Sequence, residues 1–360
     1  MKRAVLCVTN PQDYIDQLTD YSIMIINPAA VISRTEYLLN NSDYSLLITD
    51  QGSQERSGGD YANEKVFWYT SGTTGDSKFC SFSQQQIDIM SKTICNSYQI
   101  TSNDRYTGIM PLWHAHGQGF YWATKHAKCE TKFLSVKDIR NLPENNPTFI
   151  TAVPDILKVV ANFNFNNLRF VRSASAAMPN SVYYTLKETF NVPVIEAFGM
   201  TEALSHCFTN PLNGPQRVGT IGFPDGIEAD IVDSQLYIKG PCLFESNWYN
   251  TGDLAELDEH GYYKIIGRHR DQINVKGKKL NPVSLEQQIL TSVTGVKECV
   301  VFGSTSVNCL YVGDDRDHDI KQFLSSLGPH CKASLVQNIE SIPISPSGKI
   351  SRTWLDKEYS

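Results

Sequence analysis

Four short segments of the sequence carry residue types that can act on a nucleotide or an acid. The first is Thr70–Lys78, in which two glycines allow a tight turn while several hydroxyls and a lysine add hydrogen-bond donors. Backbone N–H groups on such a turn, together with these side chains, can hold a polyphosphate. The segment does not fit the GxxxxGK[ST] pattern, so an ordinary turn rich in turn-forming residues explains it equally well.

The second segment, Glu196–Glu202, follows the apolar run 192–195 and therefore comes at the carboxyl end of a predicted strand. Open α/β sheets bind their ligands at this edge. Glu202 can hold Mg²⁺, Thr201 can meet a phosphate, and Phe198 can stack on a base. Taken alone, the segment is better explained as a helix start that Thr201 caps, with Glu202 at the positive end of the helix dipole.

Two further segments each place one charged residue on a turn. Asp253, in Thr251–Asp253, can accept hydrogen bonds from both hydroxyls of a ribose, although tight β-turns of this composition are common. Lys349 lies on the Pro/Ser/Gly-rich segment 343–352. It can act as a mobile cation for a developing negative charge, or it can be an ordinary solvated lysine.

The elements that would position these segments indicate an α/β fold with a largely parallel sheet. Short apolar runs predict strands at 66–69, 106–110, 148–153, 168–173 and 192–196. Helical periodicity predicts helices at 84–98, 155–162 and 181–190. The polar, Gly-rich stretch 51–60 is predicted to be a loop.

After about residue 210 the pattern changes to short alternating segments, which predict a small antiparallel β subdomain. A compact α+β tail follows, with a helix at 282–290, a strand at 298–302 and a helix at 320–327. We therefore predict a large N-terminal domain, 1–268, and a small mobile C-terminal domain, 269–360.

Composition excludes several classes of protein. The net charge of −6 over 360 residues argues against a nucleic-acid-binding surface. The unbroken apolar runs are far shorter than a membrane helix needs, so no membrane association is expected. Nine scattered cysteines without a CxxC motif favour free thiols in the cytoplasm.

The four segments, with Leu236–Pro241 and Gly267–Gly277, occur in the order and approximate spacing of the adenylate-forming superfamily, which includes acyl-CoA synthetases, adenylation domains and luciferases. The resemblance covers nearly all of residues 30–356. It implies that ATP and a small carboxylic acid form an acyl-adenylate, and that a thiol of coenzyme A or carrier-protein phosphopantetheine then takes the acyl group. Because a carboxylate is already ionised near pH 7, the first step needs no general base.

The resemblance also implies a role for each matching residue. Those expected to bind ATP through its phosphates or adenine are Thr70, Ser71, Gly72, Thr73, Thr74, Gly75, Lys78, Ala174, Ser175, Phe198 and Gly199. Those expected at the α-phosphate, the Mg²⁺ ion and the ribose are Thr201, Glu202, Asp253 and Arg268. Lys349 would bridge the attacking carboxylate and the phosphate. Rotation of the C-terminal domain about Arg270 would then withdraw Lys349 and bring the Gly277 loop to the thiol channel.

The acid is expected to bind near Pro111–Gly117, which resembles the PLFHxxG segment of acyl- and aryl-CoA synthetases. This resemblance implies that His114 borders the acyl pocket and acts in catalysis, with Gly199 and His206 as further pocket residues. A metal pair of His114 and His116 is disfavoured, because no third ligand has a useful spacing and the expected metal is Mg²⁺.

Three segments resemble the oxalate–CoA ligase branch in particular, namely Arg172–Pro179, Met200–Ala203 and Asn210–Leu212. They favour a small polar or dicarboxylic acid. His206 lies one position away from a histidine of that branch, so a buried histidine with satisfied hydrogen bonds is about equally plausible.

The sequence departs from the superfamily in three ways that bear on function. One is a short tail between Gly303 and Pro343, whose reduced surface could alter the thiol acceptor. Ser77-Lys78-Phe79 stands where relatives usually have Pro-Lys-Gly, and only 68 residues precede Tyr69, roughly half or less of the usual length. The missing pocket wall is expected to be rebuilt or to come from a second subunit of a homodimer. Transfer to a non-thiol acceptor and a non-catalytic nucleotide-binding role remain the alternatives.

Overall fold

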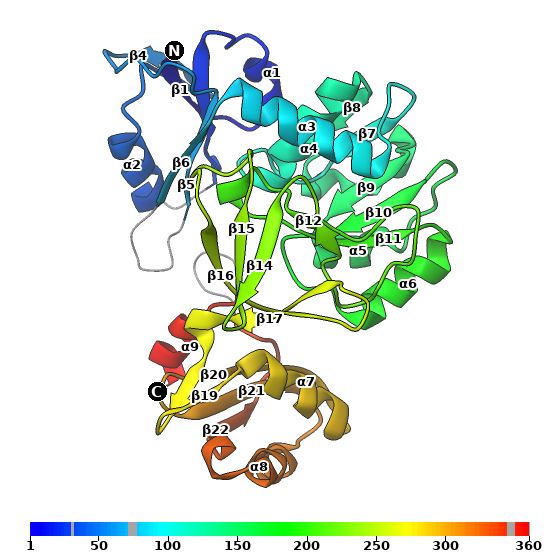
Figure 1. Cartoon of the computed structure of the whole chain (residues 1–360). Coiled ribbons are helices and arrows are strands. Elements are labelled where there is room, and N and C mark those ends of the chain that lie inside the picture. The colour runs from blue at the N-terminus through cyan, green and yellow to red at the C-terminus, as the bar shows by residue number, and fades with distance from the viewer. Residues whose placement is uncertain (30–31, 71–77, 344–349, 360) are drawn as a thin grey trace. The chain divides into compact units, whose positions relative to one another are not determined.

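The computed structural model describes residues 1–29, 32–70, 78–343 and 350–359, except for the side chains of 32–34 and 70. It contains two compact units (Figure 1). The first comprises Met1–Ala229, Ile238–Tyr249 and Leu257–Lys264, and the second comprises Asp230–Tyr237, Asn250–Glu256 and Ile265–Ser360. The domain boundary between 268 and 269 stays a prediction.

The first unit begins with a six-stranded sheet in the order β4-β3-β1-β2-β5-β6. Its strands are β1 (Lys2–Cys7), β2 (Tyr21–Ile25), β3 (Leu46–Thr49), β4 (Gly52–Glu55), β5 (Val66–Thr70) and β6 (Lys78–Phe82), and its helices are α1 (Gln12–Ile15) and α2 (Ile32–Asn41). Strand β1 pairs in parallel with both β2 and β3. Buried side chains alternate between its two faces, so the sheet carries a core on each side.

Part of the predicted loop 51–60 is a strand, and the sequence interpretation was wrong there. Gly52–Glu55 forms β4, which pairs antiparallel with β3, and all four of its residues are exposed. An edge strand is held by backbone hydrogen bonds to its neighbour and needs no apolar face, so its polar composition concealed it.

A seven-stranded sheet in the order β13-β12-β11-β10-β9-β7-β8 follows. Its strands are β7 (Arg105–Gly108), β8 (Glu130–Phe133), β9 (Phe149–Ala152), β10 (Phe170–Ser173), β11 (Val194–Phe198), β12 (Phe208–Thr209) and β13 (Phe223–Pro224). Strands β7 to β11 pair in parallel, and β12 and β13 add antiparallel. The predicted α/β fold is confirmed.

Helices cover both faces of this sheet (Figure 1). They are α3 (Gln84–Tyr98), α4 (Ala115–Ala127), α5 (Pro154–Val160) and α6 (Asn180–Phe190), with 3₁₀ turns η1 (Val136–Asn141), η2 (Pro143–Asn145) and η3 (Thr201–Ala203). Helices α3 and α4 pack over one buried cluster, and α5 and α6 pack over the other. Helix α3 spans the predicted 84–98 because Ser83 and Gln86 form a capping box at its start.

A four-stranded sheet follows in the order β14-β15-β16-β17 and confirms the predicted β subdomain. Its strands are β14 (Glu228–Val232), β15 (Gln235–Lys239), β16 (Tyr249–Leu257) and β17 (Tyr263–Arg268).

The second unit ends in the α+β tail that the sequence predicts. Its strands are β18 (Ile273–Val275), β19 (Lys278–Leu280), β20 (Val296–Phe302), β21 (Val307–Gly313) and β22 (Ala333–Asn338). Its helices are α7 (Pro282–Ser292), α8 (Asp317–Ser326) and α9 (Arg352–Tyr359), with 3₁₀ turns η4 (His269–Asp271) and η5 (Pro329–Cys331). Helices α7 and α8 share a buried cluster with strands β20 to β22.

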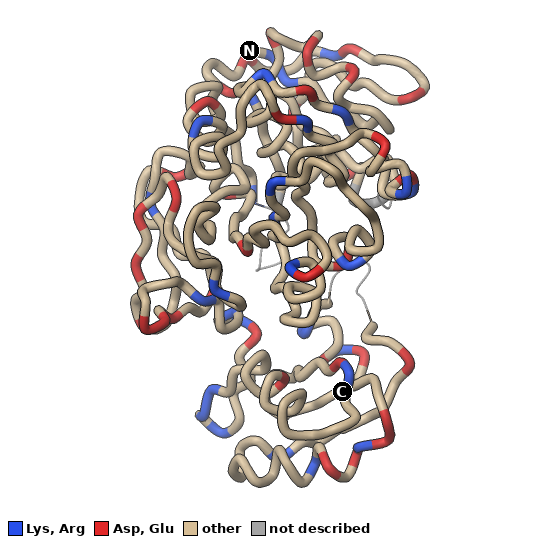
Figure 2. The backbone as a smooth tube through the Cα atoms, turned by 90° about the vertical axis from the view of Figure 1, so that its right-hand side faces the viewer, with Lys and Arg blue, Asp and Glu red and all other residues tan. Residues whose placement is uncertain are grey.

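Charged residues of both signs are interspersed along the chain (Figure 2). This distribution agrees with the mild net charge and with the absence of a strongly basic sequence. In the part of the chain that the structure describes, no helix is long and apolar enough to cross a membrane.

Candidate active site

The carboxyl edge of the seven-stranded sheet brings together the residues predicted to flank adenine. Ala174 and Ser175 follow β10, and Phe198 ends β11. Because β10 and β11 pair in parallel, with Ser173 opposite Glu196, the segments that leave them emerge at the same edge. Such an edge is the usual ligand site of an open α/β sheet.

Lys78 and Glu202 lie within electrostatic reach of one another in the first unit. Lys78 begins β6, and its Nζ donates a 3.1 Å hydrogen bond to the Tyr249 hydroxyl. This bond, with a further contribution from the Glu202 carboxylate, raises the pKa of Lys78 above its usual value. A cation and a carboxylate from distant segments therefore share one region, as binding of a metal-bound polyphosphate requires.

Glu202 provides a carboxylate next to the Thr201 hydroxyl, which fits its predicted role as an Mg²⁺ ligand. It follows Thr201 at the start of η3, where a hydroxyl and a carboxylate stand side by side in the chain. Among the described residues, no three His, Cys, Asp or Glu side chains gather as a metal cluster. Mg²⁺ commonly takes only one or two protein carboxylates and completes its shell with phosphate oxygens and water, so a single carboxylate suffices beside a nucleotide.

Several predicted ATP-binding residues lie outside the described part of the chain, namely Ser71, Gly72, Thr73, Thr74, Gly75 and the catalytic candidate Lys349. Thr70 ends β5, and its side chain is not described. The roles assigned to these residues stay predictions.

A buried polar network underlies the edge of the seven-stranded sheet. At its centre, Arg172 of β10 is only 1% exposed. Its Nε donates to the Tyr98 hydroxyl at 2.8 Å, and its Nη1 lies 3.2 Å from Thr151 Oγ1 and 3.1 Å from His116 Nε2. Among the described residues Arg172 forms no ion pair with a carboxylate, although its face of the sheet is otherwise largely apolar. The Arg172 charge contributes to lowering the pKa of Asp225, so this carboxylate offsets part of the cost of burying the guanidinium.

The two histidines of the Pro111–Gly117 segment differ in their surroundings. His114 is exposed and stands at the N-cap of α4. His116, two residues further along the chain, is 6% exposed and hydrogen-bonds at both ring nitrogens. The catalytic and pocket roles predicted for His114 remain untested.

His206 is buried, and only one of its two ring nitrogens has a hydrogen-bond partner among the described residues. Its Nε2 lies 2.6 Å from Asp225 Oδ2, which also accepts from Ser97 Oγ, whereas Nδ1 has no partner among the described residues. Burial lowers the pKa of His206, against the opposing effect of the Asp225 carboxylate. The predicted pocket role of His206 therefore stays a prediction, with one nitrogen still available.

Gly199 is required by a close backbone approach. A Cβ built on it would lie 1.7 Å from the Ser205 carbonyl oxygen. Any side chain here would push apart the two segments that carry Phe198 and His206. Glycine at this position therefore allows the two segments of the predicted pocket to pack closely.

In the second unit, the predicted ribose ligands Asp253 and Arg268 form an ion pair of 2.7 Å. The Asp253 side chain is 3% exposed, and its Oδ2 has no hydrogen-bond partner in the described part of the chain. Burial raises the pKa of Asp253 to about 6, and Arg268 opposes this shift. A carboxylate with one oxygen held and one oxygen available suits an acceptor for a hydroxyl donor.

The predicted hinge and thiol-channel residues lie on neighbouring segments of the second unit. Arg270 is in η4, and its Nε is 3.5 Å from Asp271 Oδ1. Gly277 lies in the tight turn between β18 and β19 with a φ of +88°, next to Lys276 at +51°. Both central residues have positive φ, as a two-residue hairpin turn requires. The hinge and channel functions stay predictions.

The start of α9 is fixed to this hinge segment by ion pairs. Arg352 Nη2 donates to both Glu286 oxygens at 2.8 and 2.9 Å, and Nη1 lies 3.4 Å from Asp271 Oδ2. Its Nε donates to the Val301 carbonyl at 3.0 Å. Arg352 follows Lys349 by three residues, so the network anchors the chain just after the predicted catalytic lysine.

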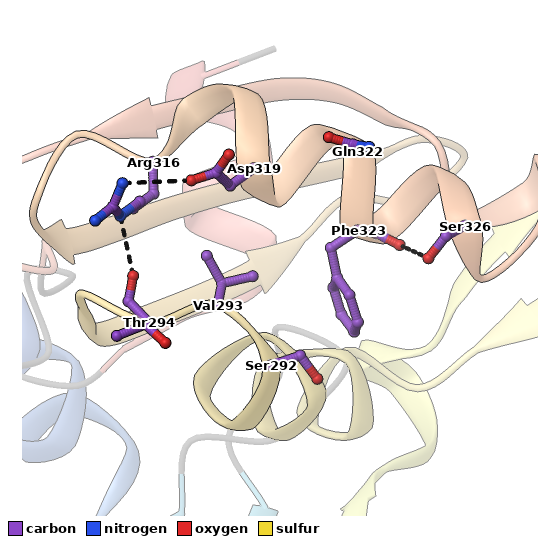
Figure 3. A pocket seen from close by; sticks show the side chains of 8 residues that line it. All are labelled: Ser292, Val293, Thr294, Arg316, Asp319, Gln322, Phe323 and Ser326. Carbon is purple, nitrogen blue, oxygen red and sulfur yellow. Dashed lines mark hydrogen bonds and ion pairs between the residues drawn. The ribbon is translucent and has the colours of Figure 1, made fainter.

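A hollow of about 420 Å³ lies between α7 and α8, away from the predicted site residues. Figure 3 shows Arg316 reaching Asp319 and the Thr294 carbonyl at one end, and Phe323 directed into the hollow from α8. The Arg316 guanidinium already has these partners, so no polar group in the hollow indicates a ligand.

Sequence reasoning assigned no role to three residues that complete the site, namely Arg172, Tyr249 and Asp225. Arg172 had a visible signal, because an arginine interrupts the apolar run of a predicted buried strand. Tyr249 and Asp225 contact Lys78 and His206 only through the fold. No local pattern in the sequence could have indicated either contact.

Comparison with known proteins identifies relatives of this chain. A family model described as AMP-binding enzyme matches residues 65–248, slightly more than half of the chain. An oxalate–CoA ligase of Arabidopsis thaliana is 28% identical over 374 residues, which cover 88% of this chain and 73% of the relative. A malonate–CoA ligase of the same organism is 27% identical over 364 residues, which cover 80% of this chain and 60% of the relative.

Among solved structures, the ATP-bound crystal structure of MatB from Rhodopseudomonas palustris aligns with a TM-score of 0.85. The alignment covers 99% of this chain and 88% of that chain at 19% sequence identity. At this identity the likeness shows a shared fold.

Proposed function

Because the chain belongs to the AMP-binding enzyme family, we propose that it is an ATP-dependent acid–thiol ligase. A carboxylate oxygen attacks the α-phosphorus of ATP, the bond to the β-phosphate breaks, and an acyl-adenylate and pyrophosphate result. A thiol then takes the acyl group and AMP leaves. The observation that carries the proposal is the meeting of Lys78 and Glu202 at one region of the first unit.

The chain's own residues contribute mainly charge and alignment, since the acid is already ionised. Lys78 supplies a cation for the β- and γ-phosphates, and Thr201 supplies a hydroxyl for the α-phosphate. Glu202 would hold Mg²⁺, which neutralises phosphate charge when bound. Asp253 would accept the ribose hydroxyls through its unpartnered oxygen, and Lys349 would stabilise charge at the attacked phosphate.

We propose a small dicarboxylic acid as the substrate. Two of the relatives are named for oxalate and malonate, which are acids of this class. The buried Arg172 beside the sheet edge supports the choice, because its guanidinium is a positive charge. Among the described residues it hydrogen-bonds to neutral groups and forms no ion pair with a carboxylate.

We further propose coenzyme A as the thiol, with carrier-protein phosphopantetheine as the alternative acceptor. Both relatives are named as CoA ligases. The Lys276–Gly277 turn and Lys278 form an exposed basic hairpin tip, which suits an acceptor that carries phosphates. A homodimer that completes the acyl pocket is part of the same proposal, and sedimentation with and without ATP would test it.

The deciding experiment is acid-dependent exchange of labelled pyrophosphate into ATP with Mg²⁺. We expect exchange with oxalate or malonate, and acyl-CoA after addition of coenzyme A. Lys349→Ala should abolish exchange and leave ATP binding largely intact. Absence of exchange with every short, dicarboxylic, aryl and fatty acid, despite ATP binding, would contradict the ligase proposal and favour a non-catalytic nucleotide-binding role.

Acyl-adenylate formation without any thioester would indicate a non-thiol acceptor such as an amine or a hydroxyl. Thioester formation only when a carrier protein is present would identify the alternative thiol. Exchange at the wild-type rate in Lys349→Ala would remove that lysine from the mechanism.

A further inference from the structure

The Lys78 side chain is held by a tyrosine that is distant in the sequence. Its Nζ donates a 3.1 Å hydrogen bond to the hydroxyl of Tyr249, 171 residues further along the chain. The same Nζ lies 5.0 Å from the centre of the Tyr249 ring, within the range of a cation–π contact. Both residues belong to the first unit. The end of the lysine is therefore tied to a residue for which the ligase proposal has no role.

The backbone of Lys78 is fixed by its neighbours in the sheet. Lys78 pairs with Thr70 in the antiparallel pair β5–β6, and the Phe79 ring packs 5.2 Å from the Tyr69 ring. Side chains alternate along β6, so Lys78 lies on the same face as the buried Cys80. What remains free is the four-carbon stem of the exposed lysine, which without a partner would sample many rotamers.

Tyr249 is a rigid acceptor for this stem. It begins β16, is 8% exposed, and packs edge-to-face against Phe244 with ring centroids 5.5 Å apart. Burial raises the pKa of Tyr249, although the hydrogen bond from Lys78 opposes this shift. The phenol therefore stays neutral at pH 7 and receives the lysine through an oxygen lone pair.

The neutrality of this partner keeps the charge of Lys78 available for a ligand. Glu202 and Glu245 lie within electrostatic reach, but in the part of the chain that the structure describes Lys78 forms no ion pair. A carboxylate partner would compete with a phosphate for the ammonium, whereas a neutral phenol competes far less. Lys78 is thus oriented without being neutralised, which suits the binding of an anion.

We propose that Tyr249 is a positioning residue for ATP, and that its hydroxyl holds the Lys78 ammonium toward the β- and γ-phosphates before the nucleotide arrives. The proposal rests on the proposed ligase function, which places Lys78 at these phosphates. Ordering a long side chain when a ligand binds lowers the affinity for that ligand. Because Tyr249 orders the lysine in the free protein, ATP binds without that loss.

The first test compares two nucleotides that differ in the phosphates assigned to Lys78. Tyr249→Phe keeps the ring and its packing on Phe244 and removes only the hydroxyl. Calorimetric titration of the full chain with ATP and Mg²⁺ should show a Kd raised about threefold to tenfold, as expected when one long side chain must be ordered on binding. The Kd for AMP, which lacks the β- and γ-phosphates, should stay at the wild-type value. An equal change for both nucleotides, or no change for ATP, would overturn the proposal.

Tyr262→Phe is the matched control. Tyr262 is 5% exposed in the same unit, and its hydroxyl donates a 2.7 Å hydrogen bond to the Pro215 carbonyl. The substitution removes the same atom from a buried ring whose hydroxyl meets a backbone carbonyl instead of a lysine, so both Kd values should be unchanged. A rise in the ATP Kd as large as that of Tyr249→Phe would trace the effect to the loss of any buried phenol hydroxyl.

A double-mutant cycle separates positioning from direct contact with the nucleotide. Lys78→Met removes the ammonium, keeps an apolar stem, and should raise the ATP Kd about tenfold or more, as expected for loss of a hydrogen bond to a charged group. In that background Tyr249→Phe should cause no further change, because Tyr249 acts through Lys78. If the two effects multiply in titrations carried to millimolar ATP, Tyr249 acts on the nucleotide independently of Lys78 and the proposal is wrong.

Pyrophosphate exchange with oxalate or malonate separates this proposal from the ligase function. In Tyr249→Phe the KM for ATP should rise and the KM for the acid should not. A rise in the KM for the acid alone would overturn the role of Tyr249 while the ligase function stands. If the wild-type protein exchanges pyrophosphate with no acid, the ligase function fails, and the titrations with ATP and AMP, which need no acid, still decide whether Tyr249 positions Lys78.

Discussion

Two arginines buried in the first unit differ in how their charge is met. Arg3, in β1, holds Glu64 with Nε and Nη2 at 2.8 and 3.0 Å, and its guanidinium stacks 3.5 Å from the centre of the Tyr61 ring. Arg172, in β10, is surrounded by hydroxyls, an imidazole and the Phe120 ring. The first charge is neutralised by the chain itself. Among the described residues the second forms hydrogen bonds only with neutral groups, so the two positions differ in whether a carboxylate pairs with the guanidinium.

The largest expected effect is on the paired arginine. Arg3→Met leaves the Glu64 carboxylate buried without its partner, and breaking a buried pair in this way costs about 3–5 kcal/mol. The loss should appear as a lower free energy of unfolding in urea. Arg3→Met combined with Glu64→Leu should recover most of it, because neither charge then remains. A cost under about 1 kcal/mol for the single variant would mean that the pair is not truly buried.

Glu196 is a buried acidic residue that, like Arg172, forms no ion pair among the described residues. Burial raises its pKa to about 7, while the Gly219 N–H, at 2.7 Å, opposes the shift. Because the folded pKa lies above the unfolded value, the carboxyl group contributes stability below about pH 4.5, and this contribution is lost as the pH rises through 7. Glu196→Gln keeps an acceptor for Gly219 and should stabilise the fold by about 3 kcal/mol at pH 8.

At pH 4 the same Glu196→Gln variant should unfold at nearly the wild-type denaturant concentration, because both side chains are then neutral. Urea titrations at the two pH values make the comparison. An equal gain at both would show that the amide packs better and that charge is not the cause.

Asp253 is both paired and unpaired: its Oδ1 forms an ion pair with Arg268, whereas its Oδ2 has no hydrogen-bond partner among the described residues. Its pKa of about 6 means that lowering the pH through 6 protonates the acceptor of the ribose hydroxyls. The affinity for ATP should therefore fall between pH 7.5 and 5.5. Asp253→Asn should raise the KM for ATP about tenfold at pH 7.5, as expected for one strong hydrogen bond.

The control for Asp253 is the variant's own pH profile. Asp253→Asn should show only the pH dependence that comes from ATP itself, so the difference between the two profiles isolates the carboxyl group. Identical profiles would remove Asp253 from nucleotide binding.

The smallest expected effect on stability is at Arg172. Arg172→Met breaks no ion pair among the described residues, and Asp225 keeps its contacts with His206 and Ser97. The Thr151–His116 and Tyr98–Thr209 hydrogen bonds also remain. The free energy of unfolding should change by less than about 1 kcal/mol, while the KM for the acid rises. If Arg172→Met lowered the free energy of unfolding as much as Arg3→Met, both arginines would serve mainly to stabilise the fold.

The sequence predicted the regular elements well where each carried its own signal. Residues 84–98 form a helix whose capping box, Ser83 with Gln86, is visible in the sequence. The helix at 115–127 was not predicted, because buried residues lie all round it and no amphipathic stripe marks it. Its Gly117 is needed because a Cβ there would come within 2.3 Å of the Pro111 carbonyl oxygen, a contact made only in the fold.

The candidate site was predictable to the extent that motifs name residues. Asp253 and Arg268 were expected at one ribose and do form a pair. The partners of Lys78 and His206 were not foreseen, because Tyr249 and Asp225 follow no fixed spacing from them. Hydrogen bonds between distant segments depend on how strands are ordered in a sheet, and a linear pattern does not contain that order.

The anchoring of α9 by Arg352 has a consequence for shortened versions of this chain. A protein that stops before Arg352 would leave the buried Glu286 carboxylate without its cation, whereas Asp271 would keep the Arg270 guanidinium at 3.5 Å. The unpaired Glu286 would destabilise α7 and expose a site of local unfolding to proteases. We therefore expect the shortened chain to be cleaved by proteases faster than the full chain.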